Sequence, residues 1–361
     1  MSKLYQDAEK LVREQFHKGT YDGARSKMDI SAIVGDVLMA KQKKDEGDWH
    51  APKPGVIHAS KLYGCLRGVF HEMIGVAADL KETQSERRMA GVFEAGHMFE
   101  DFIVDSLGDR VLERQREYKM QYKSLTLVGH SDYRVDDNGI MRIGENKSVH
   151  SDAFWYRQQE GTLVQWHNQV QLQIYLWLER KLFNNEWEGI FSYISKDDCT
   201  IDYAAVKFNP VIIDEIVIPA LDLLNEAYEK AMPLLDTRES LRVQFAAASK
   251  RAQEGEGSRA EAEATQLEAE LKKVNEDLIA IGNTLPLPKS AVFNDQKASY
   301  TVNWLCKYCD RHNTCAGAGW LIEAQSEVKR LNAEHKASIV RSVSGGTTPT
   351  PKAKIGIAGE E

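Results

Sequence analysis

The sequence predicts an α/β domain with a central mixed sheet that helices flank. Two short apolar segments lie on either side of the turn Asp136-Asp137-Asn138-Gly139 and predict a β-hairpin, over residues 125–135 and 140–149. Apolar residues at helical spacing predict helices before and after this hairpin, at 59–76, 86–107, 163–184 and 210–235. Further segments predict strands at 112–122, 187–195 and 200–208. Helices that alternate with strands in this way are typical of an α/β domain.

The composition sets limits on where this protein works and what it binds. Hydrophobic residues make up 42% of the 361 residues and charged residues 28%, which supports an ordinary soluble core. No apolar run approaches the length of a membrane span, and the N-terminus lacks the apolar stretch of a signal peptide. We therefore expect a cytoplasmic protein, in a prokaryotic cell or an infected host cell. The formal net charge of −8 argues against non-specific coating of DNA, although a local basic groove can still bind it.

Shifts in composition predict how the chain is divided. We expect an N-terminal helical region at 1–57, a core domain at 58–235, a helical hairpin at 236–285, a cysteine-containing segment at 286–335 and a disordered tail at 336–361. The hairpin segment is rich in Ala, Glu, Lys and Leu, with a Gly-Glu-Gly-Ser break at 255–258. Its mixed charges favour a protein partner or self-association over direct contact with DNA.

Asp132, Glu145 and Lys147 form the most informative group in the chain. A strand has a side-chain period of two, so Glu145 and Lys147 share a face, and the hairpin brings Asp132 next to them. Two carboxylates and an amine at a sheet edge are suited to bind Mg²⁺ or Mn²⁺ and to cleave a phosphodiester, and the carbonyl of Asn146 is a further candidate ligand. The alternative is a solvated hairpin with ordinary charges, since such spacing is common.

Two further segments carry residues that can join this group. Gln171 and Tyr175 lie four residues apart on one face of a strongly apolar predicted helix, where a buried amide needs a partner such as a phosphate or a metal-bound water. Alternatively, the glutamines of this helix face water. His97 lies on the predicted helix upstream of the hairpin and is a candidate metal ligand or, alternatively, an ordinary satisfied histidine.

Together these motifs resemble the RecB-like branch of the PD-(D/E)XK nuclease superfamily, over about residues 58–208. The family pattern is a helical His, then Gly-x-x-Asp, Glu-x-Lys and a helix with Gln-x-x-x-Tyr. The matching residues are His97, Gly129, Asp132, Glu145, Lys147, Gln171 and Tyr175. The resemblance implies a PD-(D/E)XK core, metal binding by the His, Asp and Glu, catalysis by the Lys, and positioning of substrate or water by the Gln and Tyr.

A second metal site is predicted from the cysteines. Cys306, Cys309 and Cys315 form a C-x₂-C-x₅-C cluster, and three such thiolates need a fourth ligand. His312 would complete a zinc site, whereas Cys65 would complete four thiolates for a [4Fe–4S] cluster. The resemblance favours the second, because some RecB-like nucleases, including the CRISPR-associated iron–sulfur exonucleases, place one Cys before the core and three after it. The remaining Cys199 is interpreted as structural.

The function that these residues predict is a metal-dependent DNA exonuclease that an iron–sulfur cluster stabilises. A chain with a net charge of −8 needs a confined basic channel, which favours cleavage from the ends of single strands. Two alternatives remain: a catalytically weak nucleic-acid-binding or partner-binding protein on the same fold, and a zinc-stabilised interaction protein.

Overall fold

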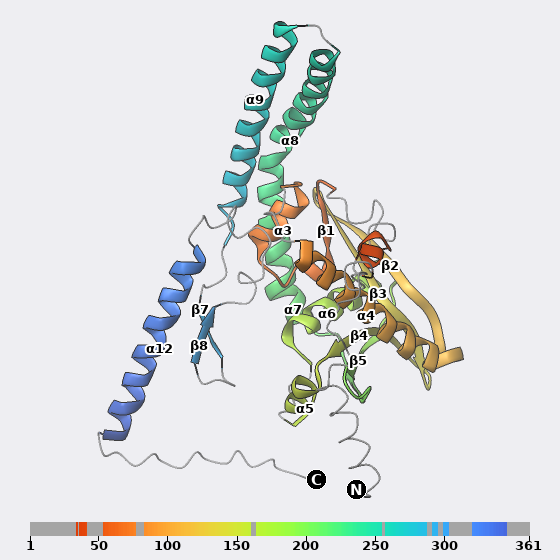
Figure 1. The fold of residues 1–361 in the computed structure, drawn as a ribbon. Helices are drawn as coiled ribbons and strands as arrows, with labels where there is room; N and C mark the ends of the chain where they lie inside the picture. Colours follow the sequence, from red (N-terminus) through yellow and green to blue (C-terminus); the bar gives the residue numbers. More distant parts are fainter. Residues whose placement is uncertain are drawn as a thin grey trace, which may run out of the picture. The chain divides into compact units, whose positions relative to one another are not determined.

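The computed structural model describes residues 34, 36–41, 53–76, 83–159, 164–254, 257–286, 291–294, 299–302 and 320–344. The chain divides into two compact units. The smaller unit comprises Met1–Ala51 and Lys81–Asp101, and the larger unit comprises Pro52–Leu80 and Phe102–Glu361. The elements that carry the candidate site lie in the larger unit and are labelled in Figure 1.

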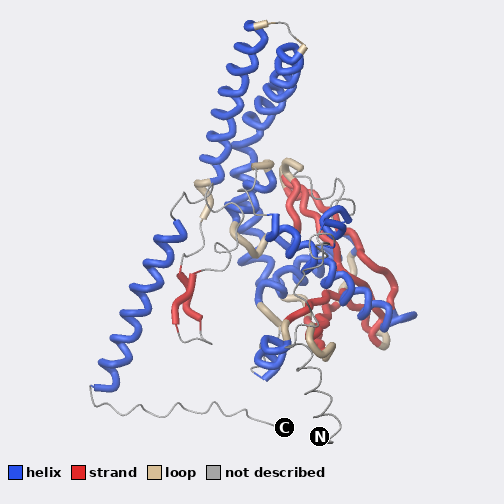
Figure 2. Tube along the Cα trace, in the orientation of Figure 1, coloured by secondary structure: helices blue, strands red, loops and turns tan. Residues whose placement is uncertain are grey.

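A six-stranded sheet forms the centre of the larger unit, and Figure 2 shows its strands in red. Its strands are β1 (Val56–His58), β2 (Val111–Tyr122), β3 (Leu125–Asp137), β4 (Ile140–Val149), β5 (Glu188–Ser195) and β6 (Ile201–Val206). The order is β1-β3-β4-β5-β6, and β2 also pairs with β3. The β1–β3 and β4–β5 pairs are parallel and the others antiparallel, so the predicted mixed sheet is confirmed.

Strand β3 has an unusual pairing pattern that shapes the candidate site. β2 pairs with β3 from Leu125 to Val135 and so occupies one of its two edges. The other edge is shared: β1 pairs with Thr126–Val128, and β4 pairs only from Tyr133 onward. Residues 129–132 therefore have no ladder partner from β1 or β4 on this edge, and the sheet opens between these two strands.

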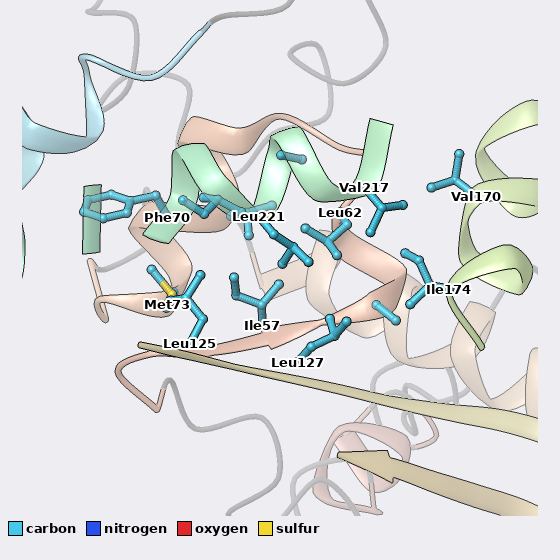
Figure 3. Close-up of a cluster of buried hydrophobic side chains, with 14 of the residues drawn as sticks. Ile57, Leu62, Phe70, Met73, Leu125, Leu127, Val170, Ile174, Val217 and Leu221 are labelled. Carbon is cyan, nitrogen blue, oxygen red and sulfur yellow. The ribbon is translucent and has the colours of Figure 1, made fainter. Parts of the chain in front are cut away.

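Helices cover both faces of the sheet. On one face, α3 (Leu66–Met73), α6 (Trp166–Phe183) and α8 (Ile218–Gln253) bury the main apolar core against β1 and β3, as Figure 3 shows. On the other face, the end of α4 (Thr83–Leu107) packs in a small cluster with Tyr133 and Val135. The predicted central sheet flanked by helices is therefore confirmed. α6 is buried on almost all sides from Val170 to Glu179, which explains its nearly continuous apolar sequence.

Two long helices form a hairpin beside this core (Figures 1 and 2). They are α8 and α9 (Ser258–Gly282), and the seam of α9 consists of buried or half-buried residues, Leu267, Leu271, Val274, Leu278 and Ile281. The expected break between residues 235 and 236 does not exist, because α8 continues through Pro233. Pro233 is exposed, so water can bond the carbonyl that loses its partner there.

The end of α9 is fastened to α3. A side chain at Gly282 would lie only 2.3 Å from Nε2 of His71, so glycine permits this close approach. The Arg67 guanidinium donates hydrogen bonds to the carbonyls of Asn283, at 2.6 Å, and of Leu285, at 2.8 Å. These bonds hold the chain that leaves α9 against the first turn of α3.

Several element boundaries differ from the expected ones. The core was expected to begin at residue 58, but strand β1, which begins at Val56, already belongs to its sheet through pairing with β3. The tail expected to be disordered begins inside a helix, since α12 (Trp320–Ser344) covers its first residues with good helix formers such as Lys336 and Ala337. The expected cysteine segment contains the hairpin of β7 (Ala291–Asn294) and β8 (Ser299–Val302). In the described parts of the chain, no helix combines the length and the apolar character needed to cross a membrane.

Candidate active site

Asp132, Glu145 and Lys147 come together where β3 and β4 separate. The antiparallel ladder between these strands runs to Tyr133 and Gly144 and stops there. The next pair along the ladder would be Asp132 and Glu145. β4 instead continues as the parallel partner of β5, in which Glu145 lies opposite Phe191. The two carboxylates thus lie on adjacent strands at the opening of the sheet.

The side chain of Asp132 takes the place of the missing ladder bond. Its Oδ2 accepts a hydrogen bond from the backbone N–H of Asn146, at 2.6 Å. A carboxylate that accepts from a backbone N–H is held in one orientation. This bond therefore fixes the Asp132 carboxylate beside the strand that carries Glu145 and Lys147.

Glu145 and Lys147 form an ion pair inside the protein. As predicted, they share a face of β4, and the Lys147 Nζ donates to Oε1 of Glu145 at 2.5 Å. Glu145 is only 2% exposed. Burial alone would lower the pKa of the Lys147 ammonium, but the carboxylates of Glu145 and Asp132 outweigh it and raise the pKa above its usual range. Lys147 is therefore a cation at neutral pH.

The second oxygen of Glu145 is the most informative atom of the site. Oε2 is buried, and no group in the described residues donates a hydrogen bond to it. The Asn146 side chain is in the same state, since its amide oxygen and nitrogen are both buried without such a partner in the described chain. A buried carboxylate oxygen without a donor is unfavourable by about 1–3 kcal/mol or more, so the arrangement suits a bound cation.

Gln171 and Tyr175 of α6 face the same opening. The Gln171 Nε2 donates to the Tyr175 hydroxyl at 2.9 Å, and both side chains are buried. Burial, and then the negative charge of Glu145, raise the pKa of the Tyr175 phenol well above its usual range. The Tyr175 ring lies so close to Gly129 that a Cβ there would be 2.6 Å from Cε1. Gly129 thus lets the ring reach the carboxylates.

The two buried glutamines of α6 have different hydrogen-bond partners. Gln171 is bonded to Tyr175 at the site, whereas Gln173 is bonded to the backbone of the chain after β6. Its amide donates to the carbonyl of Lys207 and accepts from the N–H of Asn209. The alternative that the α6 glutamines face water is therefore wrong for both buried residues, and Gln173 has a structural partner.

Tyr63 is a neighbour of the site that the sequence did not reveal. Burial raises the pKa of its phenol, while the Lys147 ammonium opposes this effect and the Glu145 carboxylate adds to it. Its ring lies 5.2 Å from the imidazole of His167, between ring centres. The only sequence signal was its place in Ser60-Lys-Leu-Tyr-Gly-Cys65, which indicated the cysteine and not the tyrosine.

Two further metal ligands were predicted, His97 and the backbone carbonyl of Asn146. His97 is exposed on α4, in the part of that helix that belongs to the smaller unit, and its role as a metal ligand stays a prediction. The same holds for the carbonyl of Asn146. No group of three or more His, Cys, Asp and Glu side chains suited to a metal ion occurs within the described residues. Asp132 and Glu145 are thus the two carboxylates that the structure brings together.

The cysteines are described only in part. Cys65 is half-buried at the N-cap of α3. Cys199 is exposed in the turn between β5 and β6, with a φ of 56°, so it does not pack in the core as a structural cysteine would. The three cysteines of the C-x₂-C-x₅-C cluster and His312 lie outside the described residues.

Comparisons with known proteins add little to this picture. No family model matches the chain, and no curated protein matches it. A solved structure titled "Crystal structure of SSO0001" is similar over 53% of this chain and 86% of that chain, with 22% identity and a TM-score of 0.38. A likeness at this level carries no argument about function. The fold and the site define a mixed α/β protein with two buried or half-buried carboxylates and a lysine at an opening of its sheet.

Proposed function

We propose that this protein is a metal-dependent DNA exonuclease of the RecB-like branch of the PD-(D/E)XK superfamily. One observation carries the proposal: Glu145 has a buried carboxylate oxygen without a donor, next to Lys147 and across the strand opening from Asp132. Most buried polar side-chain atoms in proteins have a hydrogen-bond partner. An unsatisfied acidic oxygen beside a second carboxylate favours a cation ligand over a purely structural role.

The residues at the opening fit Mg²⁺ or Mn²⁺. Both ions prefer oxygen ligands and need few of them from the protein. Asp132 and Glu145 would hold the ion, with the carbonyl of Asn146 as a further proposed ligand. When bound, such an ion lowers the pKa of a water molecule and neutralises charge on a phosphate.

The chain's own residues supply the remaining functions. Because the pKa of Lys147 is raised, its ammonium serves better to stabilise negative charge on a phosphate oxygen than to remove a proton from water. Burial, and then the charge of Glu145, raise the pKa of the Tyr175 phenol and keep it protonated. Since its oxygen already accepts from Gln171, its O–H is available to orient water or substrate.

The path of the chain after α9 supports a cluster built on Cys65. Arg67 lies two residues after Cys65 and holds the carbonyls of Asn283 and Leu285. The chain that leads to the three later cysteines therefore starts beside α3. We propose that Cys65, Cys306, Cys309 and Cys315 bind a [4Fe–4S] cluster that closes the fold as a staple, with a zinc ion on the three cysteines and His312 as the alternative.

The proposed partners follow from the same arrangement. The substrate would be DNA, entering by an end, and the α8–α9 hairpin would serve a protein partner or a second copy of the chain. Its exposed surface carries both signs of charge, as in the neighbouring Glu268, Glu270, Lys272 and Lys273, which favours a protein over a nucleic acid.

A digestion assay tests the proposed activity. End-labelled linear single strands, linear duplexes and circular DNA are incubated with Mg²⁺ or Mn²⁺ and the wild type, Lys147→Ala or Glu145→Gln. We expect both variants to lose at least 100-fold in rate, because each removes charge that acts on the phosphate or the ion. Lys272→Ala, an exposed lysine on α9, is the matched control and should digest normally. Equal digestion by wild type and Lys147→Ala would show that the proposed site is wrong.

A further inference from the structure

Strand β2 contains a residue in a conformation that strands do not normally allow. Gln115 has a φ of 49°, in the left-handed region. The other four residues with a side chain and a positive φ in the described chain lie in turns or at a helix end: Lys123, Asn138, Asn184 and Cys199. A side-chain residue in this region is strained, and it persists only where its surroundings require it.

Gln115 lies directly opposite Asp132. The β2–β3 ladder pairs Arg114 with Tyr133 and Arg116 with Ser131, and it skips the position between them. The register is the same on both sides, so no residue is inserted and this is not a bulge. The β2–β3 register thus skips Asp132, and the β3–β4 ladder ends one residue away from it, at Tyr133.

The side-chain alternation of both strands reverses at this point. On β3, Gly129 faces Tyr175 of α6, and in a regular strand Arg134, five residues later, would face away from α6. Instead the Arg134 guanidinium donates to Glu179 of α6 at 3.0 Å, and Tyr133 packs on the opposite face. β3 therefore changes face between residues 129 and 133.

The side-chain alternation of β2 reverses at the same place as that of β3. Arg116 lies over the ring of Phe183 of α6, 4.6 Å from its centre, and Tyr118 stacks on Tyr175. Glu113 also lies on the α6 side, since it accepts from Arg134 at 2.9 Å. Glu113 and Arg116 are three positions apart, so in a regular strand they would lie on opposite faces. The reversal on β2 thus falls at Arg114 or Gln115, and only Gln115 has the left-handed backbone that explains it.

We propose that the left-handed backbone of Gln115 reverses the side-chain alternation of β2 and β3. This reversal places Asp132 on the same face of the sheet as Glu145 and Lys147. Without the reversal, Asp132 would point away from α6 and from the opening. Gln115 is a positioning residue that acts through its backbone conformation. The proposal rests on the proposed function only in that it treats Asp132 as a cation ligand.

Substitutions at Gln115 and at Lys119 test this device. Lys119 is exposed on the same strand, in a regular ladder pair with Val128. Glycine accepts the left-handed region and valine resists it. We expect Gln115→Gly to raise the urea midpoint of unfolding and to keep the wild-type Kd for Mn²⁺. Gln115→Val should raise that Kd at least tenfold and speed hydrogen exchange of the Asn146 amide, which Asp132 protects, at least tenfold.

The control position should behave in the opposite way. Lys119→Gly should lower the midpoint, since glycine weakens a regular strand, and Lys119→Val should leave Kd and exchange unchanged. A wild-type Kd and normal Asn146 exchange in Gln115→Val would overturn the proposal. If that variant does not fold, the glycine variant decides, because a lowered midpoint there contradicts a strained Gln115. If the wild type binds no Mn²⁺, the proposed function fails, while Asn146 exchange still tests the positioning.

Discussion

Gly129 links the two halves of the candidate site at the scale of single residues. It is the first residue of the Gly-x-x-Asp motif, and the ring of Tyr175, from the Gln-x-x-x-Tyr motif, occupies the space that its side chain would fill. Two motifs that lie far apart in the sequence are therefore parts of one contact. The sequence predicted both motifs, but the contact between them depends on how α6 packs on β3, which no local spacing encodes.

Replacing Gly129 tests this contact. In Gly129→Ala, the new methyl group would lie 2.6 Å from Tyr175 and 3.1 Å from the Cβ of Ala59, so both must shift. We expect a loss of about 1–3 kcal/mol in the free energy of unfolding and a fall in cleavage larger than the stability loss explains. Urea unfolding and the digestion assay measure the two effects.

A glycine without close neighbours is the control for this substitution. Apart from the backbone of its own helix, a Cβ at Gly96 in α4 would meet no atom of the described residues within 4 Å. Gly96→Ala should therefore be neutral or stabilise the helix by up to about 1 kcal/mol. Equal behaviour of the Gly129 and Gly96 variants would show that the Tyr175 ring does not need the space at Gly129.

At the scale of elements, the sequence predicts regular structure well and its exceptions poorly. The predicted hairpin segments coincide with β3 and β4, because a two-residue turn and alternating apolar residues are local signals. β1 was missed as a strand since it has only three residues and its partner lies far along the chain. The opening at Asp132 was also missed, because it depends on how β1 and β4 share one edge of β3. The reversal at Gln115 was missed because nothing in the local sequence indicates a left-handed backbone there.

The attachment of α9 to α3 is a second property of elements that can be tested. Arg67→Ala removes the charged donor to the carbonyls of Asn283 and Leu285, and we expect a loss of about 1.5–3 kcal/mol in the free energy of unfolding. If the chain after α9 leads to a cluster with Cys65, the iron bound per chain should fall as well.

Unfolding in urea and iron analysis on the purified protein measure these effects. Arg259→Ala removes an exposed arginine of α9 and should change neither quantity. If Arg67→Ala keeps its full iron content, the attachment of α9 to α3 is not needed for the cluster to assemble, and this prediction is wrong.

At the scale of the whole molecule, the proposal assigns two metals to different tasks. The ion at Asp132 and Glu145 would act in cleavage, and the cluster at Cys65 would close a loop that spans most of the larger unit. Closing a long loop removes chain entropy from the unfolded state, so the cluster should contribute more to stability than the ion does. The sequence predicted this division from the ligand types, since oxygens suit Mg²⁺ and thiolates suit iron or zinc, and the family resemblance favoured iron over zinc.

Selective removal of each metal tests the division of tasks. EDTA should stop cleavage at once, while the far-ultraviolet circular dichroism stays unchanged and the free energy of unfolding falls by no more than about 3 kcal/mol, the effect of losing a ligand present at about 100 times its Kd. Re-adding Mn²⁺ should restore cleavage. Oxidative loss of the cluster, followed by its visible absorbance, should instead lower the unfolding midpoint, and Mn²⁺ should not restore cleavage. If cluster-free protein keeps its unfolding midpoint and still cleaves DNA with Mn²⁺, the cluster has no structural role. A structural cluster stabilises the fold, so its loss must lower the midpoint.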